Sequence, residues 1–418
     1  MNTKMRTGAA MLAVGALALT GCGRGDGDDD AAPEPAQSVA EGEASGTVEV
    51  WAMGTEGERL GEFAEAFVAD NPDVQINVTA IPWDAAHDKI ATAIAGGQTP
   101  DVSMIGTTWM GEFAATGALD PTPELIDSGS FFEGAWESTN VGGTNYGVPW
   151  YVETRVLYYR SDLVEEPPTD WEGLTTMAQD AKAAGAEWGI NLQPGQTGAW
   201  QTFMPFAWQA GAEMTNEDGT AFTIDSPEMV EALTYFQTVF TEELAPTALP
   251  QGALEPDFMA GKIASFVSGP WHVGILEELD ADGMDNVALA PLPAGDEQAS
   301  FIGGANLAVF KDAENRDAAW KFVEWLSQPE VQVEWYAAVN DLPSVQSAWD
   351  DPAIADDEYL SVFGDQLETA VAPPSIPTWE EVASVIDTEL ERLAKSGADP
   401  QEVATSIQEQ ADAIGTGL

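Results

Sequence analysis

The sequence is short of the residues from which many enzyme sites are built. It has one cysteine, Cys22, and two histidines, His87 and His272, in 418 residues. One cysteine excludes an internal disulfide, and so few Cys and His side chains nearly exclude a zinc site or a histidine-dependent triad. The chain also lacks the Gly-x-Ser-x-Gly, His-Glu-x-x-His and Gly-x-x-x-x-Gly-Lys patterns. We therefore predict no metal and no cofactor.

Positive charge is scarce as well. Lys and Arg number 14 against 71 Asp and Glu, which gives a formal net charge of −57. Such a chain repels nucleic acid and anionic lipid headgroups, so we expect no nucleic-acid partner. Because the acids are spread along the whole chain, we interpret them as a solubilising surface suited to a saline exterior rather than as a cation-binding device.

Long apolar runs are confined to the N-terminus. Two basic residues precede Met11–Thr20, an apolar run too short to span a bilayer comfortably, and Leu19-Thr20-Gly21-Cys22 resembles a bacterial lipobox. We predict a lipoprotein signal peptide over residues 1–21. Lipidation of Cys22 would then hold the protein at the outer face of the cytoplasmic membrane, in an extracellular or periplasmic location.

The segment after the lipobox has the composition of a linker. Residues 22–46 are rich in Gly, Asp, Glu, Ala and Pro and poor in apolar side chains. Such a segment buries too little apolar surface to offset the entropy of ordering, so we expect an acidic disordered tether.

The rest of the chain is long enough for two folded domains. Strands are expected at Thr47–Ala52, Val74–Val78 and Val102–Ile105, with an amphipathic helix between each pair. This alternation predicts an α/β fold whose parallel or mixed sheet is covered by helices. In such sheets ligands bind beyond the carboxyl ends of the strands.

The stretch Tyr146–Asp162 carries the most chemistry. It runs from a turn into a strand rich in aromatic and β-branched residues, and Trp150, Glu153 and Arg155 lie within six residues of one another. A sugar site needs such groups, because aromatic rings stack on the apolar faces of a pyranose while carboxylates, amides and guanidinium groups bind its hydroxyls.

Four segments together resemble the family 1 extracellular solute-binding proteins, the sugar receptors of ABC importers. The resemblance covers nearly all of residues 47–418 and is specific for the family rather than for one ligand. It implies an α/β, two-lobed, type II periplasmic-binding-protein-like fold, with mixed sheets covered by helices and a ligand cleft between the lobes. The four segments are the strand-helix-strand opening, Tyr146–Asp162, Phe258–Ala264 with Gly269-Pro270-Trp271, and Gly303–Phe310 with Ala318–Phe322 and Leu342-Pro343.

The resemblance also implies where the lobes begin and end. The N-terminal lobe is expected to comprise residues 47–152 and 304–341, and the C-terminal lobe residues 153–303 and 342–418. The pair Gly303-Gly304 suits a hinge, with a strand bulge as the alternative. We expect a monomer whose partners are a small-molecule sugar and the transmembrane permease subunits.

The aromatic candidates for ligand binding are tryptophans near loops. Trp150 and Trp271 each follow a proline, and both resemble stacking positions of the family. Trp83 and Trp109 open expected helices and could also stack on a sugar. The alternative for each is an ordinary core position, since the chain has 15 tryptophans.

The polar candidates lie at loops and at the first crossing between the lobes. Glu56 and Asp101 could bind hydroxyls or be surface charges. Glu153 and Arg155 could bind the ligand or pair with each other. The resemblance to the family's cleft adds Gly304, Asn306 and Trp379.

The resulting hypothesis is a lipid-anchored, non-enzymatic receptor that closes two lobes over a mono-, di- or oligosaccharide and delivers it to a permease. One alternative is a receptor for another solute such as a polyamine, because polyamine binders share the two lobes and favour acids and aromatics. A glycosidase that uses two carboxylates is the other alternative, since pairs of acids are uninformative in so acidic a chain.

Overall fold

The computed structural model describes residues 36–195 and 198–418. The predicted signal peptide, Cys22 and the first part of the tether lie outside the described residues. Within the described ranges, no helix is both long enough and apolar enough to cross a membrane.

The largest sheet of the described residues is mixed, as the alternating pattern predicts. Its order is β11-β6-β10-β3-β1-β2, and β12 pairs with β10. Strand β1 runs parallel to its neighbours β2 and β3, whereas β10 runs antiparallel to both β3 and β6. The strands are β1 (Gly46–Met53), β2 (Val74–Ile81), β3 (Val102–Gly106), β6 (Val148–Thr154), β10 (Ser300–Val309), β11 (Leu342–Pro343) and β12 (Ala370–Val371).

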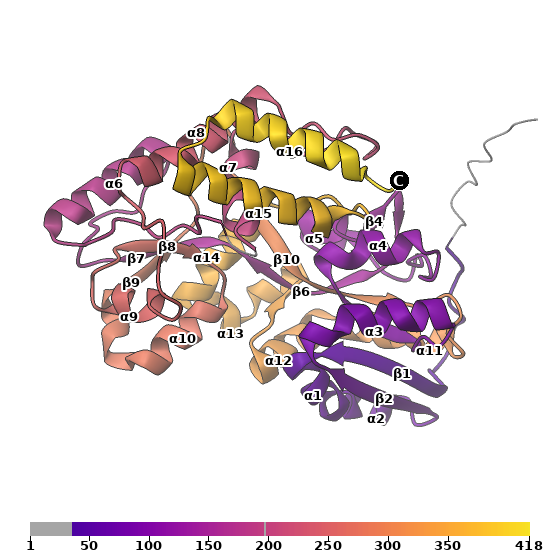
Figure 1. Ribbon diagram of the computed structural model, residues 1–418. Helices are drawn as coiled ribbons and strands as arrows, with labels where there is room; N and C mark the ends of the chain where they lie inside the picture. The colour runs from indigo at the N-terminus through magenta and orange to yellow at the C-terminus, as the bar shows by residue number, and fades with distance from the viewer. Residues whose placement is uncertain (1–35, 196–197) are drawn as a thin grey trace, which may run out of the picture. The chain divides into compact units, whose positions relative to one another are not determined.

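Helices cover both faces of this sheet (Figure 1). On one face, Val50 of β1 shares a buried cluster with Leu60 of α1 and Phe322 of α11. On the other face, Ile90 of α3 and Phe113 of α4 pack in a separate cluster. The helices of this part are α1 (Gly54–Phe63), α2 (Glu65–Asp70), α3 (Trp83–Gly96), α4 (Met110–Ala115), α11 (Arg316–Leu326) and α12 (Pro329–Val339).

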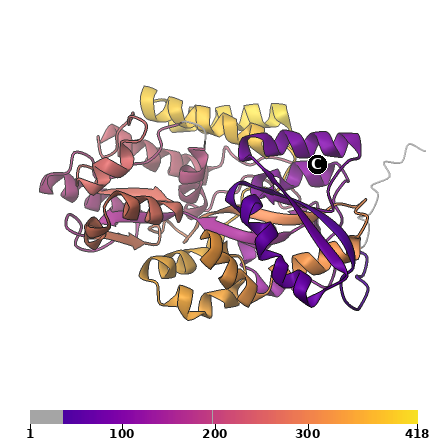
Figure 2. The ribbon, with the colours of Figure 1, turned by 90° about the horizontal axis from the view of Figure 1, so that it is seen from below.

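The second sheet is smaller and wholly antiparallel, in the order β8-β7-β9. Its middle strand β7 follows β6 with a single residue, Arg155, between them. Figure 2 shows β6, in magenta, running toward this second sheet. The strands are β7 (Val156–Arg160), β8 (Ser265–Ser268) and β9 (Val287–Ala290), and the surrounding helices are α6 (Trp171–Ala184), α7 (Trp200–Gln209), α8 (Pro227–Thr241), α9 (Leu254–Met259), α10 (Trp271–Leu279), α13 (Pro352–Ala355) and α14 (Glu358–Leu367).

Short elements complete the chain between these larger ones. They are α5 (Glu133–Glu137), the hairpin strands β4 (Asn140–Val141) and β5 (Thr144–Asn145), and the 3-10 helices at Thr107–Trp109, Ser128–Ser130, Ala281–Asn286 and Gln346–Asp350.

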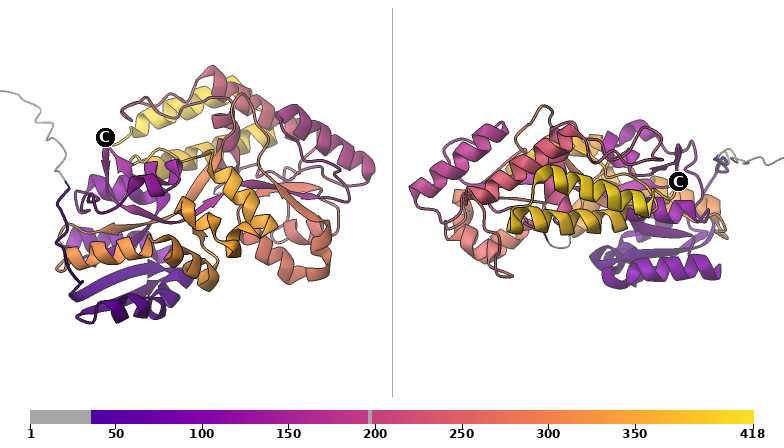
Figure 3. Two further views of the ribbon diagram at one scale, coloured as in Figure 1. Left: turned by 180° about the vertical axis from the view of Figure 1, so that it is seen from behind. Right: turned by 45° about the horizontal axis from the view of Figure 1, so that its top comes forward.

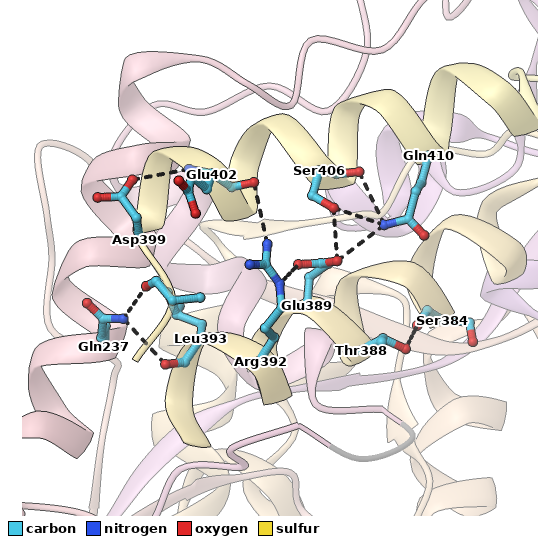
Figure 4. Close-up of polar contacts among 11 residues, drawn as sticks. Gln237, Ser384, Thr388, Glu389, Arg392, Leu393, Asp399, Glu402, Ser406 and Gln410 are labelled. Atoms are coloured by element: carbon cyan, nitrogen blue, oxygen red, sulfur yellow. Dashed lines mark hydrogen bonds and ion pairs between the residues drawn. The ribbon is translucent and has the colours of Figure 1, made fainter. Parts of the chain in front are cut away.

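Two long helices, α15 (Trp379–Ser396) and α16 (Pro400–Ile414), end the fold and lie side by side (Figure 3). Their apolar faces pack into the large cluster around α7 and α8. A buried carboxylate, Glu389, joins them on the polar side. It accepts hydrogen bonds from Arg392 at 2.6 Å, Ser406 at 3.0 Å and Gln410 at 3.2 Å (Figure 4).

The described residues include a segment that precedes the predicted first strand. Residues 36–45, which the sequence assigns to the disordered tether, lie against the first part of the fold. Arg316 donates a hydrogen bond to a backbone carbonyl of this segment at 2.9 Å, and Asn71 accepts one from a backbone N–H at 2.8 Å. Part of the predicted tether therefore contacts the folded domain, while its disorder stays a prediction.

We predict that Glu389→Ala lowers the free energy of unfolding by about 1–3 kcal/mol, because it leaves three donors of the α15–α16 pair without their acceptor. Denaturant-induced unfolding followed by circular dichroism measures the effect. The matched control is Glu409→Ala on α16, whose side chain is exposed and which should change stability by less than about 0.5 kcal/mol. Equal effects of the two substitutions would contradict the prediction.

Candidate ligand-binding site

A cavity of about 670 Å³ lies where the two sheets meet. Four elements of different parts of the chain contribute most of its wall: the start of α1, strand β6, helix α10, and the segment from the end of α12 to β11. The lining residues are Glu56, Trp83, Tyr151, Val152, Glu153, Pro270, Trp271, Val273, Gly274, Glu277, Tyr336, Val339, Asn340, Asp341, Leu342 and Leu360.

Carboxyl groups gather on one side of the cavity. Glu56 lies in the first turn of α1, directly after the carboxyl end of β1, and is 7% exposed. Burial raises the pKa of the Glu56 carboxyl, although hydrogen bonds from its own backbone and from the Tyr151 hydroxyl oppose the rise. The expected position beyond a strand end thus places a partly desolvated acid where a ligand can reach it.

Asp341 shares this side of the cavity. Trp335 donates its indole N–H to the Asp341 carboxylate at 3.0 Å. Burial, and then the nearby charges of Glu56 and Glu153, hold the pKa of Asp341 well above its usual range. The cluster therefore carries less negative charge than its number of acids suggests, and a protonated carboxyl can donate as well as accept a hydrogen bond.

Two indoles provide the exposed aromatic surface of the cavity. Trp271 is 43% exposed and Trp83 is 39% exposed, although most tryptophans of the described chain are buried or half-buried. Trp83 meets Trp109 edge to face, with ring centroids 5.8 Å apart. Trp109 itself does not line the cavity and is half-buried behind Trp83.

Glu153 and Arg155 were expected either to bind the ligand or to pair with each other, and the structure contains features of both arrangements. Glu153 lines the cavity, and its carboxylate also lies 3.4 Å from the Arg155 guanidinium. Arg155 is 3% exposed and does not reach the cavity wall. The pair therefore has one member toward the ligand space and the other behind it.

Trp150 lies in the core, contrary to its predicted place in the cleft. It is 2% exposed and stacks on Trp335 with ring centroids 4.9 Å apart. Successive side chains of a strand point to opposite faces, so the Trp150 ring is directed away from the face that Glu153 occupies. The same alternation places Tyr151 beside Glu153, and it is the signal by which this missed cavity residue could have been found.

Three further predicted residues are buried away from the cavity. The Asp101 carboxylate accepts a hydrogen bond from the backbone N–H of Glu49 at 2.8 Å, so it fixes the start of β3 against β1. Asn306 is 1% exposed and bonds Ser138, whereas Trp379 is fully buried. These side chains stabilise the fold around the cavity instead of lining it.

Gly304 has a structural reason to be glycine. Its φ is +116°, and a Cβ at this position would lie 2.2 Å from the backbone oxygen of Tyr151. The register between β10 and β6 shifts one residue later, between Ala305 and Asn306. Close backbone approach beside an irregular pairing explains Gly304 without a hinge, so the hinge remains a prediction.

Sequence patterns did not single out Tyr336, Asn340 or Asp341 as ligand-binding residues. Tyr336 lies on α12, and the other two follow that helix, where Asn340 adopts a left-handed conformation with φ of +63°. This tight helix end turns the chain back toward β11 and places Asp341 in the cavity. Such placement depends on the packing of α12 against α1, which no local pattern reports.

Comparison with known proteins identifies the family. The model of the bacterial extracellular solute-binding proteins matches residues 53–333, which is more than half of the chain. The chain is a bacterial extracellular solute-binding protein. Family membership confirms the resemblance and the prediction that this protein is not an enzyme.

Relatives of this solute-binding protein align over most of their length. The structure of the sugar-binding protein MalE from Xanthomonas citri has 32% sequence identity and a TM-score of 0.83, covering 88% of this chain and 97% of that chain. The maltotriose-binding protein of Pyrococcus abyssi is 28% identical over 386 residues, 88% of this chain and 82% of the relative. A maltooligosaccharide ABC transporter solute-binding lipoprotein of Streptococcus pneumoniae is 27% identical over 394 residues, 89% of this chain and 86% of the relative. The likeness in structure confirms the predicted periplasmic-binding-protein-like α/β fold.

We predict that Asp341→Asn stabilises the ligand-free protein at about pH 7 by roughly 2 °C in Tm. The pKa of Asp341 is higher in the folded state than in the unfolded chain. As the pH rises above the ordinary pKa of Asp, the carboxyl therefore ionises in the unfolded chain while it stays protonated in the folded one. The free energy of unfolding falls as the pH rises from the unfolded pKa to the folded pKa. The amide removes this loss, and the gain in Tm should shrink toward about pH 3 and below, where both states are mostly protonated.

A pH series of differential scanning calorimetry measures this difference. Asp350→Asn, at an exposed position of the Gln346–Asp350 helix, is the matched control and should show no gain. A gain for Asp341→Asn that is largest at low pH would have the wrong sign and would contradict the prediction.

Proposed function

We propose that this solute-binding protein binds an oligosaccharide of the maltodextrin class in the cavity and delivers it to the permease of an ABC importer. The observation that carries the proposal is the combination of two exposed indoles, Trp83 and Trp271, with the acids Glu56, Glu153 and Asp341 in one cavity. The indoles offer flat apolar surfaces for sugar faces, and the carboxyl groups bind hydroxyls. The names of the relatives support α-linked glucose oligomers as the first ligands to test.

The state of the acids favours a neutral ligand over a polyamine. A polyamine would be attracted most strongly by fully ionised carboxylates. Burial instead raises the pKa of both Glu56 and Asp341, so these two carboxyls ionise less readily than exposed acids. Neutral hydroxyls can pair with either form, whereas an ammonium group needs the charge.

The same proposal includes an anchored receptor with two lobes. Cys22 would carry the lipid, as the lipobox predicts, and the similarity to a pneumococcal lipoprotein supports this. The lobes would comprise residues 47–152 with 304–341 and residues 153–303 with 342–418. Closure of these lobes over the cavity would remove water from both sides of the ligand and present the closed receptor to the permease.

Isothermal titration calorimetry with maltotriose, maltose, trehalose and spermidine tests the ligand class. We expect at least one glucose oligomer to bind with a micromolar Kd, which requires only about −8 kcal/mol. Binding of spermidine and of no sugar would overturn the sugar assignment in favour of the polyamine alternative.

We predict that Trp271→Ala weakens binding of the best sugar by about 30-fold, because it removes one of the two exposed ring surfaces. Since Trp271 is 43% exposed, the Tm of the ligand-free protein should change little. The matched control is Ile275→Ala, one turn later on α10 and 39% exposed but outside the cavity wall. Unchanged affinity in Trp271→Ala, or an equal loss in the control, would contradict this role.

A further inference from the structure

Arg155 occupies a singular position in the chain. It is the one residue between β6 of the first sheet and β7 of the second. Its backbone carbonyl accepts a hydrogen bond from the Ser300 hydroxyl at 2.7 Å, where β10 begins. The side chain thus starts from a backbone position that three strands fix.

The guanidinium lies between two aromatic rings. Its carbon is 4.8 Å from the ring centroid of Trp271 and 4.9 Å from that of Phe301. The other side of this arrangement is the cavity, because Trp271 is 43% exposed and lines it. The planar guanidinium of Arg155 therefore packs against Trp271, which is more exposed than the other cavity indole, Trp83.

Polar contacts fix the rotation of the guanidinium. Nη2 donates to the side-chain oxygen of Gln201 at 2.6 Å and to Glu153 at 3.4 Å. Nη1 lies 3.4 Å from the same Glu153 oxygen but makes no hydrogen bond of good geometry with any residue in 36–195 or 198–418. Arg155 consequently touches a carboxylate of strand β6 and an indole of helix α10, and both of these side chains line the cavity.

Space around Trp271 is restricted in a way that matches this arrangement. A Cβ at Gly269 would lie 2.0 Å from the Trp271 ring, so the ring folds back over a residue without a side chain. The Gly269 carbonyl accepts a hydrogen bond from the buried Tyr158 hydroxyl at 2.7 Å. The Trp271 indole therefore packs against both Gly269 and Arg155.

Core packing alone does not require a charge here. Burying a guanidinium with one incomplete ion pair costs free energy, and an apolar side chain of similar volume is often neutral or stabilising at such a position. A methionine would fill the space between Phe301 and Trp271 but would neither hold Glu153 nor present a flat cation to the ring.

We propose that Arg155 is a positioning residue that fixes the Trp271 indole relative to the Glu153 carboxylate. One sugar ring can then stack on the indole and donate a hydrogen bond to the carboxylate at the same time. The effect on binding rests on the proposed sugar-binding function, whereas the effect on Trp271 does not. The ligand never touches Arg155 in this scheme; the residue acts through its two neighbours.

The test compares Arg155→Met and Arg155→Lys with the wild type in the full chain labelled with 5-fluorotryptophan. The fluorine NMR signal of Trp271 is identified by its loss in Trp271→Phe. We expect this signal to move or broaden in ligand-free Arg155→Met while the signals of distant tryptophans stay in place. The matched control, Arg392→Met on α15, removes an arginine that does not line the cavity and should leave the Trp271 signal unchanged.

Titration with maltotriose measures the consequence for binding. Arg155→Met should raise Kd by about 10-fold while Tm stays the same or rises. Arg155→Lys should rescue little of the affinity, because an ammonium group keeps the charge but not the plane. In a Trp271→Ala background, Arg155→Met should add less than about 2-fold, since the two residues act as a unit.

An unchanged Trp271 signal in both Arg155 variants would overturn the proposal, and so would full additivity with Trp271→Ala. Should Arg155→Met fold poorly, Arg155→Lys supplies the same comparison of the indole signal. If wild-type protein binds no sugar, the proposed function fails, but the fluorine experiment still decides whether Arg155 positions Trp271.

Discussion

The antiparallel pairing of β6 with β10 is the interaction on which the rest of the structure depends. It joins Thr154 to Ile302 and Val152 to Gly304 at the point where the chain passes from one sheet to the other. One buried cluster surrounds this crossing and contains residues of both sheets. The cavity lies beside this crossing, between α10 and the end of α12, and residues of β6 form part of its wall.

The close packing of β6 against β10 at this crossing also favours glycine at positions 303 and 304. Gly304 admits the Tyr151 carbonyl, and a Cβ on Gly303 would meet both the Phe301 ring at 2.6 Å and the Glu153 carboxylate at 2.9 Å. Two glycines in the middle of a strand reduce its intrinsic stability. Here they allow large side chains of neighbouring residues to reach the cavity and the space behind it.

Sequence patterns sufficed for the fold because its signals are local and repeated. The strands β1, β2 and β3 and the helices between them follow from hydrophobic periodicity, and the family segments supply the remainder. The site was harder to predict. Glu56, Glu153, Trp83 and Trp271 line the cavity, but Trp150 was assigned by its proline neighbour when strand alternation points it into the core. Asp341 reaches the cavity only through the packing of α12, which distant residues determine.

The attachment of residues 36–45 would have a mechanical consequence if the receptor is anchored to a membrane through Cys22, as we propose. Tension along the tether would reach the contacts with Arg316 and Asn71 before it reaches β1. Arg316 in turn forms an ion pair with the buried Asp120 at 2.7 Å. Asp120 is in turn bonded by the indole of Trp320 in the core. A thermal pulling force on the tether would therefore act first on α11 and its core contacts. The strand β1 would bear less of this force.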